Sequence, residues 1–304
     1  MFMHKIAGIC CFDWSPVGKR LMWLGSSALP FLQYIFERML AKDECFFVLE
    51  CVRLFDDTML REILGPLFEV YTLLVSPTLL GDPIERPRKY MIVFRVGKIA
   101  WGRHISEMGH QRAFELLFGR NTRMLGSEKM GATEQAVREH IVKLVSHRNM
   151  PARRASGRMW SHYQVLSPSC RRMVDRYDEA LIAAGLDHRG HWTANLIWTP
   201  EYLMPAGRNM GTLVRNRLVW NFQKQRCMLH LELMEAQGHA VYCAEDNPHR
   251  CSFIGVLESL RDSSVRSIAG SGMHLRVVAL VIAFVLACAE VPHAPPRGAG
   301  PGES

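Results

Sequence analysis

The sequence predicts an α/β fold, a partial doubly wound sheet whose strands are mostly parallel. In the first 96 residues, short apolar runs alternate with segments whose apolar residues recur three and four positions apart. The order strand, helix, strand, helix, strand favours parallel strands covered by helices on both faces. The 304 residues, 48% of them hydrophobic and 22% charged, suffice for such a core and a further region.

The elements of this core follow one another closely. The run KIAGIC (5–10) predicts a strand. PFLQYIFERMLAKD (30–43) predicts a helix, since its apolar spacing is helical and Pro30 suits a first turn. CFFVLECV (45–52) is continuously apolar, which predicts a buried strand.

The pattern then repeats. DDTMLREILGPL (56–67) predicts a helix capped by Asp56 or Asp57, and strands are predicted at 70–77 and 89–96. Ligands of such sheets bind at the carboxyl ends of the strands. Cys11 and Glu50 both lie at such ends, so we expect them in one crevice.

The net charge of +8 is confined to the middle of the chain. Residues 97–215 carry 18 basic and 10 acidic residues, whereas 1–96 and 216–304 are balanced at 11 and 11, and at 8 and 8. This predicts a core part at 1–96, a basic region at 97–215 and a return to the core at 216–290. The basic region fits a polyanion-facing surface, and a solvated, loosely ordered insert explains it equally well.

The end of the chain contains a long apolar run, 275–289. It has about 15 residues where a membrane span needs about 20, so it predicts a buried core helix and no membrane partner. The Pro- and Gly-rich tail 291–304 is predicted to be disordered. Nine cysteines without a CxxC pair, and no secretory signal at the start, indicate an intracellular protein.

Four motifs, each weak alone, agree in their order. AGICCFDWSPVGKR (7–20) is similar to a Gly-Pro-Pro-Cys loop followed by Trp-Ser and Gly, and FVLECV (47–52) to a Glu-Asn-Val strand end. GDPIERPRKYMIVF (81–94) resembles a Gly-x-Pro-Gln-x-Arg-x-Arg segment leading into a strand. The late segments ELMEAQG (232–238) and SIAGSGMHL (267–275) complete the set. Together they resemble the cytosine-5 DNA methyltransferase family.

This resemblance covers about 3–96 and 218–289, and the basic region falls where the family has its target recognition domain. It implies methyl transfer from S-adenosylmethionine to carbon 5 of a flipped-out cytosine in DNA. Cys11 would be the nucleophile that adds to carbon 6, helped by a pKa lowered near basic residues. Glu50 would activate the ring, and Arg86 and Arg88 would hold the base carbonyl and a phosphate.

Plainer interpretations stand beside these roles. Cys10 and Cys11 can be small buried residues, Glu50 a cap or ion-pair partner, and the two arginines solvated. Cys10 also replaces the family's proline, and Ile84 its glutamine.

The cofactor side departs further. The family's Phe-x-Gly-x-Gly loop and ribose-binding acidic residue would precede Met3, so we expect an N-terminally truncated member that relies on a partner chain for that segment. Gly270, Ser271 and Gly272 would remain as cofactor-binding residues. The alternatives are a catalytically silent nucleic-acid- or partner-binding remnant, and methylation of cytosine in transfer RNA.

Two other groups of residues predict no site. His188 and His191 have the spacing of a metal pair without a third ligand, so no metal is predicted. Trp192, Trp198 and Trp220 are expected to pack in a core rather than stack on bases. The resemblance implies a nuclear location if the source is eukaryotic.

Overall fold

The computed structural model describes residues 3–9, 13–15, 18–121, 123–152, 158–196, 206–213, 218–242 and 250–292. The chain forms two compact units. The sheet unit comprises 1–75, 87–119 and 278–304, and the second unit comprises 76–86 and 120–277. The division differs from the boundaries expected at 97 and 215: residues 97–119 belong with the sheet, and 216–277 with the second unit. The predicted disordered tail, beyond residue 292, lies outside the described residues.

The central sheet has four strands in the order β1-β2-β4-β3. They are β1 (Met3–Gly8), β2 (Glu44–Val52), β3 (Phe68–Val75) and β4 (Arg88–Arg95). β1 is parallel to β2, and β4 is antiparallel to both β2 and β3. Strands β1, β2 and β3 therefore run in one direction, as the α/β prediction required, and only β4 is reversed. The connection between β3 and β4 contains the 3-10 helix η4 (Pro77–Leu80) but no α-helix, whereas parallel strands are usually joined by an α-helical crossover.

One face of the sheet is covered by α1 (Ala28–Leu40) and α2 (Thr58–Leu64). Phe31 and Ile35 of α1, one helical turn apart, pack with Phe47 and Val93 of the sheet in one buried cluster. Each such side chain contributes about 1.5–3 kcal/mol when fully buried. The expected cap is shared: Asp57 occupies the N-cap position, while the Asp56 carboxylate accepts a hydrogen bond from the Thr58 amide.

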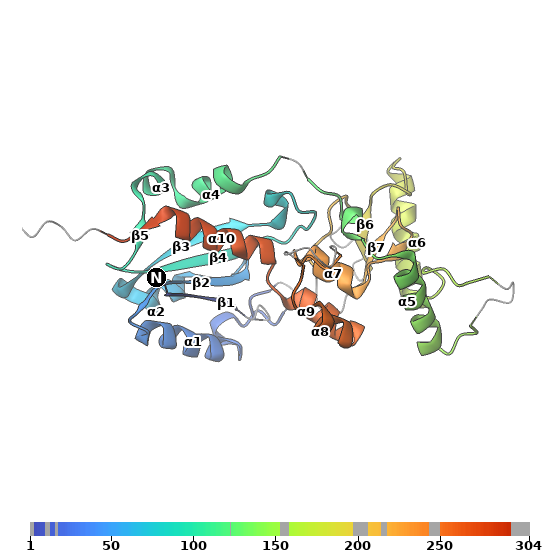
Figure 1. The fold of residues 1–304 in the computed structure, drawn as a ribbon, viewed down its shortest axis with the longest axis horizontal. Helices are drawn as coiled ribbons and strands as arrows, with labels where there is room; N and C mark the ends of the chain where they lie inside the picture. The colour runs from blue at the N-terminus through green and yellow to red at the C-terminus, as the bar shows by residue number, and fades with distance from the viewer. Residues whose placement is uncertain are drawn as a thin grey trace, which may run out of the picture. The chain divides into compact units, whose positions relative to one another are not determined.

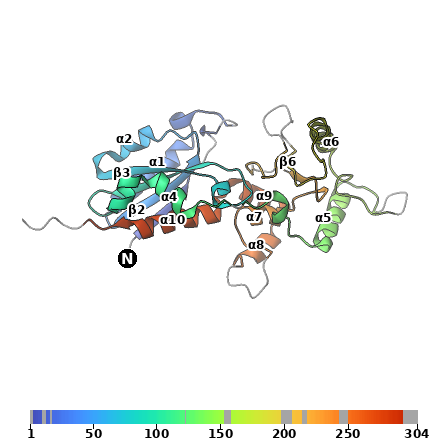
Figure 2. The same cartoon turned by 90° about the horizontal axis from the view of Figure 1, so that it is seen from above.

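The other face is covered by α4 (His110–Phe118) and α10 (Leu275–Cys288), as Figures 1 and 2 show. Phe284 of α10 lies 5.0 Å from Trp101 and 5.5 Å from Phe114 between ring centroids. The expected core helix is thus observed. By length and composition alone, Asp262–Cys288 would suffice to cross a membrane, but two helices share this stretch, and α10 buries Val281 and Phe284 completely. The smaller elements of the unit are η2 (Met22–Leu24), η3 (Gly65–Leu67), β5 (Ala100–Trp101), α3 (Arg103–Met108) and β9 (Ala289–Glu290).

The second unit combines short helices with a small antiparallel sheet in the order β6-β7-β8. Trp220 is fully buried beside Tyr177 and Phe222, which confirms its expected core position. Trp192 packs against the same cluster, and Trp198 lies outside the described residues. The elements are η4 (Pro77–Leu80), η5 (Gly126–Lys129), α5 (Glu134–His147), α6 (Pro168–Ala183), β6 (Thr193–Asn195), β7 (Val219–Asn221), β8 (Arg226–Cys227), α7 (His230–Ala236), α8 (Ile254–Ser259) and α9 (Asp262–Ser271).

Candidate active site

Glu50 and Arg88 form an ion pair in the sheet unit. Arg88 Nε lies 3.1 Å from Glu50 Oε1, and the two side chains are only 13% and 9% exposed. The strand register causes this contact: Arg88 lies opposite Val52, two residues beyond Glu50, so both side chains point to the same face. That face is opposite to the one that Leu49 and Cys51 bury. The structure thus brings two of the predicted site residues together.

The predicted nucleophile, Cys11, and its neighbour Cys10 lie outside the described residues. The chain on either side of them is well anchored. The Ile9 amide donates a 2.8 Å hydrogen bond to the backbone carbonyl of Glu50. Beyond the gap, Trp14 is buried against Phe55 and Trp23, at centroid distances of 5.1 and 5.8 Å. Cys11 is therefore two residues along the chain from a residue bonded to the Glu50 backbone.

The far anchor of this loop depends on Asp13. Asp13 is only 1% exposed. Its carboxylate accepts hydrogen bonds from the amide and the hydroxyl of Ser27, just before α1. Gly25 permits this approach, because a Cβ there would lie 2.1 Å from the Asp13 carboxylate. Asp13 directly precedes the Trp-Ser motif. Its hydrogen bonds to Ser27 were not predicted from the sequence.

Arg86 belongs to the second unit, although it is only two positions from Arg88. Its side chain is buried, and its guanidinium donates 2.9 Å hydrogen bonds to the carbonyls of Leu213 and Gly272. Both terminal nitrogens also lie 3.4 Å from the Gly270 carbonyl. Arg86 thus ties the predicted cofactor segment to the backbone of Leu213. Its contact with a base or phosphate stays a prediction.

The Gly270–Gly272 segment does not have the form of a nucleotide cradle. Gly270 and Ser271 end helix α9, and Gly272 caps it with φ of −69°. None of the three is among the glycines with positive φ, and the carbonyls of Gly270 and Gly272 already accept from Arg86. These residues do not by themselves fit S-adenosylmethionine.

The two late motifs lie side by side. Gln237 donates through its side chain to the Ala269 carbonyl, and its own carbonyl accepts a 2.9 Å bond from the Leu275 amide. Gly238, at φ of +88°, faces the ring of His274. Burial lowers the pKa of His274 to about 4, and its Nδ1 accepts from the Val277 amide, so the imidazole is neutral at pH 7.

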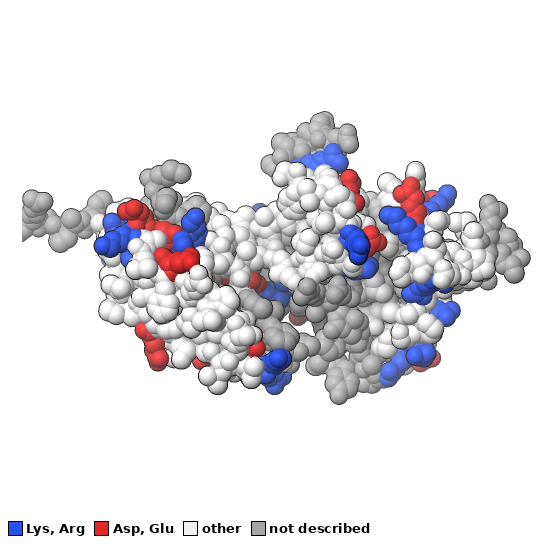
Figure 3. All heavy atoms as spheres, turned by 90° about the horizontal axis from the view of Figure 1, so that it is seen from below, with Lys and Arg blue, Asp and Glu red and all other residues white. Residues whose placement is uncertain are grey.

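A basic pocket of about 400 Å³ opens on the second unit. Three arginines from two chain segments line it, together with one carboxylate, Glu128. Arg276 is held by a 3.1 Å ion pair with Asp82, whereas the residues Arg120 and Arg123 are exposed. On the face drawn in Figure 3, Lys and Arg form several separate groups rather than one stripe. The pocket is lined by Leu80, Gly81, Arg120, Arg123, Met124, Glu128 and Arg276.

The histidines with metal-pair spacing have other contacts. His191 Nδ1 lies 3.0 Å from the Ser127 hydroxyl, and its Nε2 lies 3.4 Å from Gln223 Nε2. His188 acts electrostatically on Asp178.

The fold is a mixed α/β fold similar to that of a solved methyltransferase. A Dnmt2 methyltransferase of S. pombe superposes with a TM-score of 0.52 at 12% sequence identity, over 93% of this chain and 77% of its own. The EhMeth methyltransferase of Entamoeba histolytica gives 0.45 at 11% identity, covering 93% and 77%. A DNMT2 variant of Spodoptera frugiperda gives 0.43 at 11%, covering 93% and 79%. No protein-family model and no curated protein matches the sequence.

Proposed function

We propose that this protein is a cytosine-5 methyltransferase that acts on DNA, with Cys11 as its nucleophile. The observation that carries the proposal is the buried Glu50–Arg88 pair, whose glutamate also anchors, through its backbone, the strand end that leads to Cys11. The methyltransferase-type fold supports it. As the motifs imply, the protein would work inside the cell, and in the nucleus of a eukaryote.

The chemistry would begin on the cytosine ring. The Cys11 thiolate forms a bond to carbon 6, and the electron pair of the 5,6 double bond moves toward carbon 5. Glu50, near the end of β2, would accept hydrogen bonds from the exocyclic amino group and from ring nitrogen 3 once that nitrogen has taken a proton from water; it would thus favour the protonated ring, whose carbon 6 is more electrophilic. Arg88, already fixed on Glu50, would donate to the carbonyl oxygen of the base. The base must leave the duplex for carbon 6 to be reached.

The methyl donor in this proposal is S-adenosylmethionine. Because Gly270–Gly272 do not fit it, we derive no step through the donor. The described residues support the activation of the cytosine ring.

The DNA would be held by its phosphates. Arg120 and Arg123 are exposed in the basic pocket and suit phosphate oxygens, which position a nucleic acid without reading its sequence. This supports a role of the second unit in substrate binding.

Hydrogen exchange at carbon 5 tests the proposal without a methyl donor. Once the thiolate has added to carbon 6, carbon 5 takes a deuteron from D₂O; loss of its original proton and of the thiolate then restores the ring. We expect the full chain to exchange this hydrogen in cytosine-containing DNA, Cys11→Ser to abolish the exchange, and Cys10→Ser to retain it.

Each of the other outcomes would contradict one part of the proposal. Exchange that survives Cys11→Ser and vanishes with Cys10→Ser contradicts the choice of nucleophile. Exchange in transfer RNA but not in DNA contradicts the proposed substrate. No exchange in either nucleic acid contradicts the proposed enzyme and favours a silent binding protein.

A further inference from the structure

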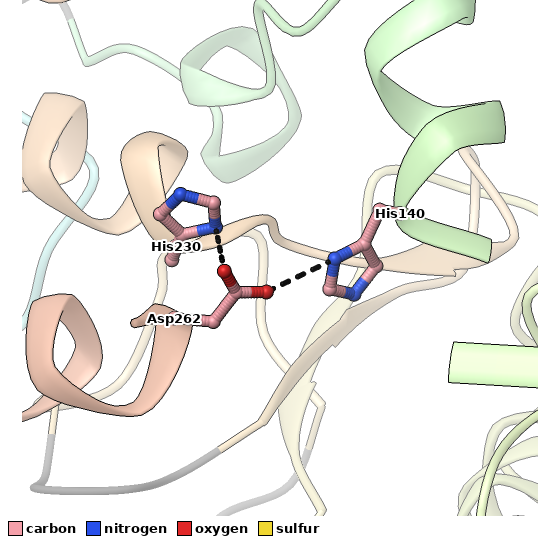
Figure 4. A group of neighbouring side chains, drawn as sticks. All are labelled: His140, His230 and Asp262. Carbon is pink, nitrogen blue, oxygen red and sulfur yellow. Dashed lines mark ion pairs between the residues drawn. The ribbon is translucent and has the colours of Figure 1, made fainter. Parts of the chain in front are cut away.

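Three potential metal ligands meet in the second unit, far from one another in sequence. His140 lies in the middle of α5, while His230 and Asp262 are the first residues of α7 and α9. Figure 4 shows the two imidazole rings on either side of the carboxylate. The ligand atoms of all three residues lie within 4.8 Å of one another.

The distances between the imidazole nitrogens and the two carboxylate oxygens leave room for a shared ion. His140 Nδ1 lies 3.3 Å from Asp262 Oδ2, and His230 Nδ1 lies 3.4 Å from Asp262 Oδ1. Charge-assisted N–H···O bonds are typically about 2.7–2.9 Å long. By contrast, two ligand atoms that each lie about 2.0–2.1 Å from a zinc ion, at the tetrahedral angle, are roughly 3.3–3.4 Å apart.

The surroundings hold the imidazoles and leave the carboxylate accessible. The side chains of His140 and His230 are 10% and 16% exposed, and that of Asp262 is 28% exposed. The His140 ring stacks on His162, with 5.4 Å between centroids and 12° between planes. The buried His230 Nδ1 makes no hydrogen bond within the part of the chain that the structure describes. A buried imidazole nitrogen in this position is available to a metal.

We propose that His140, His230 and Asp262 bind one Zn²⁺ ion, with a water molecule as the fourth ligand. Two imidazole nitrogens favour zinc over magnesium or calcium, which prefer oxygen ligands. The ion would join α5 to the first turns of α7 and α9 and so stabilise the second unit. Lys143 and Arg266 act electrostatically on His230 and oppose a cation, so the site binds more weakly than a closed four-ligand site.

This site is independent of the proposed methyl transfer, and zinc alone is the probe. The full chain, freed of metal by a chelator and kept reduced, is titrated with Zn²⁺ by calorimetry and melted with and without the ion. We expect one ion per chain and a raised melting temperature. Both His230→Ala and Asp262→Asn should weaken binding at least tenfold and remove the rise in melting temperature. His147→Ala, an exposed histidine of the same helix α5, is the matched control and should change neither.

Cobalt substitution separates this site from the cysteines of the chain. Co²⁺ bound here should show the visible bands of a tetrahedral ion with nitrogen and oxygen ligands, and no thiolate charge-transfer band. A thiolate band, binding unaltered by both substitutions, or no saturable binding of Zn²⁺ by the unaltered chain would each overturn the proposal. The cobalt spectrum and the Zn²⁺ titration are measured on the unaltered chain, so they decide the question even where a variant fails to fold.

Discussion

Arg88 Nε and Glu50 Oε1 lie 3.1 Å apart across two antiparallel strands, in a place where both side chains are almost fully buried. Removing two charges from water is costly, and the cost is offset only while both partners remain. The pair therefore has two separable effects. It stabilises the sheet, and it holds a carboxylate in β2 beside the end of β1, the strand that leads to Cys11.

The first prediction separates these effects by a double-mutant cycle. Arg88→Met should lower the free energy of unfolding by about 3–5 kcal/mol, since the Glu50 charge is left buried without its partner. The double variant Glu50→Gln/Arg88→Met should regain much of that loss in a denaturant titration. Its exchange of the carbon 5 hydrogen should stay at least about 100-fold below that of the unaltered protein, because a general acid–base group is lost.

The control is additivity: the stability losses of Glu50→Gln alone and Arg88→Met alone are added and compared with the loss in the double variant. If stability losses simply add, the two side chains do not interact. If the double variant regains exchange together with stability, Glu50 is a purely structural residue.

The second prediction concerns the basic pocket. The double substitution Arg120→Gln/Arg123→Gln should weaken DNA binding. The slope of the logarithm of the binding constant against the logarithm of the salt concentration should become shallower by about 1.8, since each lost phosphate contact removes about 0.9 from the slope. Fluorescence anisotropy at several salt concentrations measures this. Arg138→Gln is the matched control: Arg138 is an exposed arginine outside the pocket, in a 3.1 Å ion pair with Glu134. An equal change in slope for both variants would mean a diffuse effect of net charge.

The third prediction concerns the anchor beside the Cys11 loop. Gly25→Ala places a Cβ against the Asp13 carboxylate, so Asp13 must leave Ser27. Thermal or denaturant unfolding should show a loss of about 1–3 kcal/mol, typical of overpacking. At Gly255, inside α8 and with open space around it, the same substitution should instead be neutral or stabilise by up to about 1 kcal/mol. A Gly25→Ala protein as stable as its parent would rule out the tight approach of Asp13.

The fourth prediction concerns His274, which is 2% exposed. Burial lowers its pKa from 6.5 to about 4 in the folded protein, whereas the unfolded chain takes up the proton near pH 6.5. Between these values the unfolded state binds more protons, so stability falls as the pH falls from about 6.5 to about 4.

His274→Gln should remove this part of the pH dependence, up to about 1.4 kcal/mol per pH unit, while it keeps an acceptor for the Val277 amide. Denaturant unfolding at several pH values compares the variant with its parent. Parallel curves for the two proteins between pH 4 and 6.5 would show that His274 protonates normally in the fold.

Sequence periodicity predicted the sheet and its covering helices well, because their apolar faces repeat within short windows. The helix expected at 30–43 is observed at Ala28–Leu40, and the one expected at 275–289 at Leu275–Cys288. The reversal of β4 was not predicted, since its residues are apolar in either direction. The charge count placed residues 97–119 outside the core, whereas they lie in the sheet unit. The Gln111 side chain accepts from the Leu74 amide and donates to the Leu74 carbonyl, and such bonds leave no mark in a charge count.

The candidate sites show the same limit. Glu50 and Arg88 could be singled out from motifs, but their contact depends on a strand register that only the three-dimensional structure gives. His140, His230 and Asp262 come from three helices spread over more than a hundred residues of chain, so no spacing rule could join them. The pair with a suggestive spacing, His188 and His191, is engaged elsewhere.

The sheet unit is assembled from three separate stretches of chain, and this affects how it folds during synthesis on the ribosome. Phe284 covers Trp101 and Phe114, yet some 170 residues lie between Phe114 and Phe284 in the sequence. At about 5–20 residues per second, the nascent sheet waits roughly 10–35 s with one apolar face uncovered. Contacts so distant in sequence also form slowly. A newly made chain is thus exposed to aggregation until α10 emerges, and a chaperone that binds the aromatic face during that interval would raise the yield of folded protein.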